Sequence, residues 1–143
     1  MLNLDDQTYS KIQQHSAKGD DYAEQGHSNR ALAEYEAALA LLPAPKDQWD
    51  AWTWLQVAIG DLWFLNQEWH RSLEAFQTAY RGPEGQENPF IQLRLGQNAL
   101  ELGDEDTATE HLLRAYMLEG SQVFEDEAPK YLAFLKSKAA HIQ

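Results

Sequence analysis

The sequence contains no cysteine among its 143 residues, and this absence removes several kinds of chemistry. Disulfide bonds, thiol nucleophiles and cysteine-ligated metal sites are excluded, and the composition fits a reducing compartment. Long apolar runs are missing too, because the longest, Ala37 to Pro45, is far shorter than the ~20 residues that span a bilayer. The first residues, Met1 to Gln14, hold no apolar run, so we expect no secretory signal, no membrane attachment and a cytoplasmic location.

Positive charge is scarce, since 11 lysines and arginines face 23 aspartates and glutamates for a formal net charge of −12. This balance argues against nucleic acid as a partner, because phosphate binding needs a basic surface. The acids are densest between residues 101 and 127, which hold nine acids and one base, Arg114. We expect this segment to attract a basic protein at low salt; the alternative is a solvated face that maintains solubility.

Enzyme motifs are also absent. The sequence has no phosphate-binding glycine loop, no HExxH pair and no serine placed at a strand-to-helix turn. His70 and Glu74 have ligand-like spacing on one helix face, but two residues do not make a zinc site. We therefore predict a protein that is not an enzyme and that has no cofactor or metal.

What the sequence does contain is one residue spacing that occurs three times. A glycine is followed at +12, +16 and +19 by a small residue, a large ring or leucine, and an alanine, and the sets start 41 and 36 residues apart. This is the period of a helical-hairpin repeat, and small residues let antiparallel helices approach closely along a seam. The sets are Gly19, Ala31, Tyr35 and Ala38; Gly60, Ser72, Phe76 and Ala79; and Gly96, Ala108, Leu112 and Ala115.

This arrangement resembles the tetratricopeptide repeat over roughly residues 12 to 120. The first set matches most fully, because Tyr22, Gly26 and Pro43 also fall where that family has an aromatic residue, a glycine and a proline. In the second, Gln67 replaces the glycine between the helices. The resemblance implies an all-α fold of three hairpins in a right-handed solenoid. It predicts a single domain over 1–143, with repeats at about 12–45, 53–86 and 89–120 and a capping helix at about 126–140.

Helix boundaries follow from proline, glycine and capping residues. Asp47, Asn88 and Asp104 are the expected N-caps of the third, fifth and sixth helices. The last helix should cover the open end of the solenoid; the alternative is a partner-binding helix. We expect helices over about 5–24, 29–41, 47–65, 68–81, 89–102, 105–119 and 126–140.

The third expected helix is apolar on more than one face. Its stripe of Trp52, Leu55 and Ile59 has the period of a core face, whereas Trp54 and Val57 point elsewhere. The resemblance places this second stripe, and the matching face of the fifth helix, on the wall of a concave groove. The alternative is that the chain's own ends bury these side chains. The candidate partner-binding residues are Trp54, Val57, Asp61, Phe64, Phe90, Leu93, Arg94 and Gln97.

These observations predict a non-enzymatic module that binds a protein partner through the aromatic groove, the acidic surface, or both. Two narrower roles fit a small acidic module. An immunity or antitoxin protein would cover a basic bacterial toxin with its acidic surface. A secretion chaperone would hold an extended effector segment against Trp54, Phe64 and Phe90.

Overall fold

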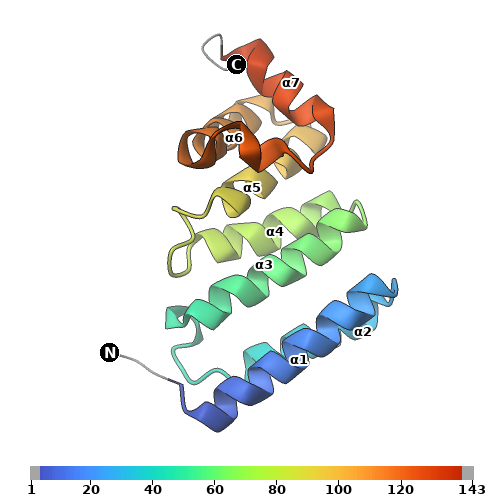
Figure 1. Cartoon of the computed structure of the whole chain (residues 1–143), viewed down its shortest axis with the longest axis vertical. Helices are drawn as coiled ribbons and strands as arrows, with labels where there is room; N and C mark the ends of the chain where they lie inside the picture. The colour runs from blue at the N-terminus through green and yellow to red at the C-terminus, as the bar shows by residue number, and fades with distance from the viewer. Residues whose placement is uncertain (1–3, 140–143) are drawn as a thin grey trace.

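The computed structural model describes residues 4–139, and within that range every regular element is helical (Figure 1). Three hairpins follow one another along the long axis of the molecule, and a last helix lies at the end opposite the first hairpin. The expected all-α tetratricopeptide-like solenoid is confirmed. The elements are α1 (Asp6–Glu24), α2 (Ser28–Ala40), η1 (Lys46–Gln48), α3 (Asp50–Leu65), α4 (Trp69–Tyr80), α5 (Pro89–Glu101), α6 (Glu105–Glu119), η2 (Gly120–Phe124) and α7 (Pro129–Lys138).

The seam of each hairpin is built as the repeated spacing predicts. A Cβ atom added at any of the three seam glycines would lie 2.5–2.6 Å from the large side chain of the same set. Tyr35, Phe76 and Leu112 therefore occupy the space that a side chain on the first helix would need. The six small residues of the second helices, namely Ala31, Ala38, Ser72, Ala79, Ala108 and Ala115, are all 0 % exposed.

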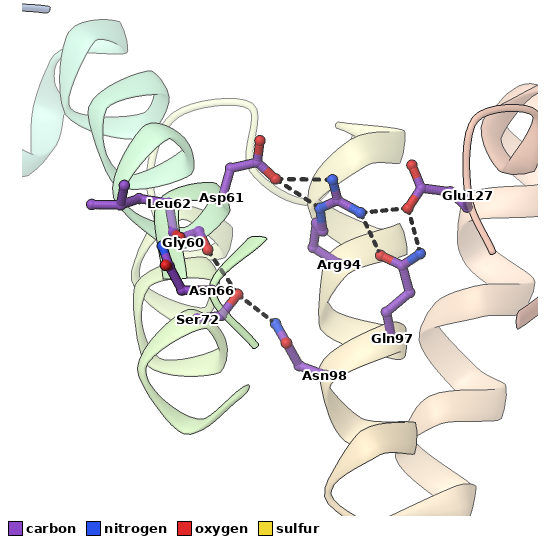
Figure 2. Close-up of polar contacts among 9 residues, drawn as sticks. All are labelled: Gly60, Asp61, Leu62, Asn66, Ser72, Arg94, Gln97, Asn98 and Glu127. Carbon is purple, nitrogen blue, oxygen red and sulfur yellow. Dashed lines mark hydrogen bonds and ion pairs between the residues drawn. The ribbon is translucent and has the colours of Figure 1, made fainter. Parts of the chain in front are cut away.

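A serine in the second seam also connects two hairpins. The Ser72 hydroxyl donates to the carbonyl of Gly60 at 2.8 Å and accepts from Asn98 Nδ2 at 2.9 Å (Figure 2). Asn98 belongs to α5, a central helix on which every residue from Ile91 to Ala99 is buried. The second and third hairpins are thus joined by polar contacts as well as by apolar packing, because buried hydroxyl and amide groups need partners.

The expected N-caps are confirmed on two helices and wrong on one. Asn88 accepts from the amides of Phe90 and Ile91, and Asp104 accepts from that of Thr107. Asp47 instead lies in η1, and α3 begins only at Asp50. The reason is a competing contact, since Lys46 Nζ donates to three carbonyls at the end of α2 and holds this segment out of the helix.

The terminal helix is shorter than expected. It begins at Pro129, because the residues after α6 form the short helix η2 and a turn. Gly120 ends α6 as predicted and has a φ of +78°, which suits glycine. The expected last residue, Ala140, lies outside the described residues.

The turn inside the second hairpin contains a strained residue. Gln67 has a φ of +60°, in the left-handed region that Gly26 and Gly103 occupy at the equivalent turns. A side chain in this conformation costs about 1 kcal/mol that glycine avoids. The presence of Gln67 in place of the glycine found at the equivalent turns therefore lowers the stability of the turn, while the backbone conformation stays the same.

We expect Gln67→Gly to raise the free energy of unfolding by about 0.5–1 kcal/mol, since the strain relieved outweighs the entropy that glycine adds to the unfolded chain. The matched control is Gly103→Gln, which places a side chain in the same conformation and should lower stability by about 1 kcal/mol. Urea denaturation of the two variants measures both values. A loss of stability in Gln67→Gly would mean that the side chain itself supports the turn.

Candidate partner-binding groove

Three clefts lie along the face formed by α1, α3 and the loop before α5, and we call them together the inner-helix groove. The first measures about 770 Å³, the second about 220 Å³ and the third about 260 Å³. The first is lined by Leu4, Asp6, Tyr9, Gln48, Trp49, Asp50, Ala51 and Trp54; the second by Asp50, Thr53, Trp54, Val57, Pro83, Glu84 and Asn88; the third by Asp20, Ala23, Glu24, Tyr35, Ala58, Asp61, Leu62 and Leu65.

Trp54 lies at the centre of this groove, because it lines both the first and the second cleft. Its side chain is half-buried and packs on one side against the core of the first two hairpins. Trp63, further along the same helix, serves that core instead and is only 8 % exposed. Trp54 is therefore a rigid aromatic side chain that keeps part of its surface open to a partner.

The loop between α4 and α5 forms one wall of the second cleft and is held firmly in place. Thr53 Oγ1 donates to the carbonyl of Pro83 at 3.0 Å, which joins the loop to α3. Gly85 is required here, because a Cβ atom at this position would lie 2.3 Å from the carbonyl oxygen of Ala79. The cleft beside Val57 is thus preformed, which lowers the entropy cost of binding.

The groove is acidic. Asp6, Asp50 and Glu84 line the first two clefts, and three further carboxylates line the third. Among the described lining residues of all three clefts there is no lysine or arginine. Asp61 is already paired with Arg94, but the remaining carboxylates beside aromatic and aliphatic lining residues favour a segment that carries both apolar and positively charged side chains.

The third cleft combines an anchored tyrosine with an exposed leucine. The Tyr35 hydroxyl donates to Asp20 Oδ1 at 2.6 Å, and burial together with this hydrogen bond raises the pKa of Tyr35 far above its usual value. Leu65 is 71 % exposed at the edge of the cleft. An isolated exposed leucine is ordinary, but one beside a cleft adds apolar area for a partner.

The groove is closed at its α5 end. Leu93, Arg94 and Gln97 are 1 %, 6 % and 0 % exposed. The Arg94 guanidinium contacts Asp61 Oδ1 through Nε at 3.0 Å and also pairs with Glu127, which follows η2 (Figure 2). Gln97 donates to the same Glu127 oxygen at 2.8 Å.

Two aromatic rings hold the same guanidinium in place. Its Cζ atom lies 3.9 Å from the centroid of Phe64 and 4.5 Å from that of Phe90. Cation–π contacts of this kind are strongest where water is excluded, as it is around a side chain that is 7 % exposed. Arg94 therefore acts here as an internal cross-link between α3, α5 and the segment after η2.

The structure thus divides the eight candidate residues into two groups. Trp54, Val57 and Asp61 line open clefts. Of the other five, Leu93, Arg94 and Gln97 are buried at the closed end, whereas Phe64 and Phe90 are half-buried there and line none of the three clefts. Their partner-binding role stays a prediction. Sequence reasoning missed Asp50 and Glu84 as groove carboxylates and Glu127 as the partner of Arg94.

The acidic segment from residue 101 to 127 is partly neutralised by the chain itself. Glu101 pairs with Lys130, Glu105 with Lys138, and Glu110 with Arg114. Glu127 is used by Arg94, and Asp104 caps α6. The carboxylates that remain free to attract a basic partner from this segment are therefore fewer than the sequence suggests.

His111 lies away from the groove and is coupled to the loop after α4. Its Nδ1 lies 2.7 Å from Gln92 Oε1, while Gln92 Nε2 donates to the carbonyl of Gln86 at 2.8 Å. Gln92 can only accept from the ring, so Nδ1 carries the proton. Burial lowers the pKa of His111, a shift that nearby Glu110 opposes and Arg114 reinforces.

The lowered pKa of His111 makes stability depend on pH. The folded state binds this proton less readily than the unfolded state, whose histidine pKa is about 6.5. The stability from His111 is therefore complete above about pH 6.5 and is lost as the pH falls from there toward the lowered pKa.

We expect His111→Gln to lose less stability than the parent between about pH 7 and pH 5. Urea denaturation at several pH values measures this, and a parent-like profile in His111→Gln would contradict the pH dependence assigned to His111.

No group of three or more histidine, aspartate or glutamate side chains in residues 4–139 is arranged to hold a metal ion. In the same range, no helix is long and apolar enough to cross a membrane. The arrangement that the described residues do provide is a rigid, acidic and partly aromatic groove on a helical-repeat scaffold.

Comparison with known proteins gives a likeness at the level of the fold. No protein-family model matches the chain, and a search of curated proteins found no relative. Among solved structures, the crystal structure of MamA matches with a TM-score of 0.63 and 18% identity, over 89% of this chain and 77% of that one. This likeness concerns the fold alone and supports a tetratricopeptide-like helical-repeat architecture.

Proposed function

We propose that this protein is a non-enzymatic interaction module that holds a segment of a protein partner in the inner-helix groove, with Trp54 as the central anchor. The observation that supports this most is the position of Trp54 between two clefts whose described lining contains carboxylates and no basic residue. Tryptophan is enriched at binding hot spots because it combines a large contact area with little flexibility. The chain acts as one domain over residues 1–143, in the cytoplasm, without a cofactor.

The partner segment is extended and carries both basic and apolar side chains. Separate clefts along α1, α3 and the loop before α5 suit an extended chain better than one folded surface, because each takes a separate side chain. This favours the secretion-chaperone or general adaptor role. The immunity role depends on the acidic segment 101–127, and several of those carboxylates already form ion pairs within the chain.

Association with the partner should depend on salt. Captured partners can be identified by mass spectrometry, and the on-rate of a purified partner measured between low and physiological salt. We expect the on-rate to fall at least severalfold as screening increases. Asp50→Asn together with Glu84→Gln should flatten this dependence, whereas Asp106→Asn with Glu119→Gln, on the outer acidic segment, should not. A salt-independent on-rate in the parent would contradict the proposed attraction between groove carboxylates and a basic partner. If only Asp106→Asn with Glu119→Gln flattens the salt dependence, the partner binds the acidic segment 101–127 and not the groove.

A further inference from the structure

We infer that residues 120–138, comprising η2, the turn after it and α7, form a C-terminal latch that closes the α5 end of the inner-helix groove and opens independently of the three hairpins. This inference rests on the proposed function and adds a means of regulating the same groove. Its basis is the contact between Glu127 of the latch and Arg94 of α5 (Figure 2).

The latch covers the part of the groove that the repeat pattern predicts to be open. Phe124 of η2 belongs to one apolar cluster with Leu93, against which Phe64 and Phe90 also pack. Glu127 accepts from Arg94 and Gln97. Leu93, Arg94 and Gln97 are therefore buried under the latch, and the half-buried Phe64 and Phe90 pack beside it.

The latch is held by fewer contacts than the helices below it. Its large buried side chains are Phe124, Tyr131 and Leu135, whereas α5 has nine consecutive buried residues. The 10 residues of α7 are too few for an isolated helix to be stable, so the helix depends on docking. Segments with few buried contacts open at lower free energy than the core of the same protein.

Opening would not leave Arg94 without a partner. Arg94 remains bonded to Asp61 through both Nε and NH2, at 3.0 and 2.9 Å, and its guanidinium remains between two rings. Glu127, whose side chain is 14 % exposed, would return to water. The usual penalty for breaking a buried ion pair, a stranded charge, is therefore small for the Arg94–Glu127 pair, while Glu101 would lose Lys130 and Tyr131 and gain water.

An open latch would lengthen the groove. Leu93 and Gln97 would become accessible, the half-buried Phe90 would gain exposure, and together they would provide apolar and amide surface to the same extended segment. When only a fraction of the molecules is open, the measured dissociation constant for a ligand that needs the open form is the intrinsic one divided by that fraction. Variants that loosen the latch should therefore bind the partner more tightly.

Hydrogen exchange followed by mass spectrometry tests the opening without any partner. Glu127→Gln should raise exchange about tenfold in residues 120–138 and leave α1 to α4 unchanged, because it weakens hydrogen bonds to a charged group. The matched control is Asp126→Asn, at a neighbouring exposed carboxylate, which should leave exchange as in the parent. Unchanged exchange in Glu127→Gln, or faster exchange through the whole chain, would overturn the independent latch.

A second variant loosens the latch at another point. The Tyr131 hydroxyl donates to Glu101 at 2.9 Å, so Tyr131→Phe removes one anchor while keeping the ring. It should raise exchange in the same residues, and both variants should bind a captured partner up to about tenfold more tightly. If Trp54→Ala abolishes binding but neither latch variant changes affinity, the groove stands and the regulatory role of the latch is wrong.

Discussion

Replacing Phe76 with alanine should lower the free energy of unfolding by about 3–5 kcal/mol. The ring is 0 % exposed, covers Gly60 on the facing helix and meets Phe90 edge-on at a centroid distance of 6.0 Å. Its loss would leave a cavity where the second hairpin joins the third. The closely packed helices around it could fill that space only by moving their backbones. Chemical denaturation measures the loss, and a cost below about 1 kcal/mol would contradict this packing.

The same seam predicts that the effect of Gly60→Ala on stability changes sign when Phe76 is removed. Gly60→Ala should destabilise the parent by about 1–3 kcal/mol, because a Cβ atom there would lie 2.6 Å from the Phe76 ring. In the Phe76→Ala background the space is free, so Gly60→Ala should be neutral or stabilising by up to about 1 kcal/mol through helix propensity. A double-mutant cycle measures this coupling. Additive effects of the two substitutions would show that Gly60 does not pack directly against the Phe76 ring.

Most of the fold could be predicted from the sequence because the repeat pattern is local and recurs. The spacing of small and large residues determines which helices pair, and three copies of it leave little freedom of register. The boundary that could not be predicted is the start of α3. Capping preference favours Asp47 as the N-cap of α3. The neighbouring Lys46 instead donates hydrogen bonds to carbonyls at the end of α2, and α3 begins three residues after Asp47, at Asp50. Such competition between neighbouring segments is not visible in capping preferences alone.

The candidate site could be predicted only in part. The periodicity places Trp54 and Val57 on a face distinct from the core stripe, and both line open clefts. It does not show that Glu127 reaches Arg94 across 33 residues, because nothing in the intervening sequence marks that contact. The burial of Leu93, Arg94 and Gln97 follows from this long-range contact and from Phe124. A repeat pattern describes each hairpin and gives no information on what the last segment covers.

Replacing Trp54 with alanine should weaken partner binding by about 2 kcal/mol or more, a loss of roughly thirtyfold in affinity. The side chain lines two clefts, and its removal would take away the one tryptophan that the two clefts share. The cost in folding stability should be about 1 kcal/mol, because the residue is only half-buried. Trp63→Ala is the matched control, since Trp63 is 8 % exposed and its loss should cost about 3–5 kcal/mol of stability.

Melting temperature and partner affinity, measured together on Trp54→Ala and on Trp63→Ala, test most directly whether the inner-helix groove is the binding site. We predict that Trp54→Ala melts close to the parent and binds about thirtyfold more weakly, while Trp63→Ala melts far lower. A Trp54→Ala variant that melts as low as Trp63→Ala, or that binds the partner as tightly as the parent, would contradict the proposal.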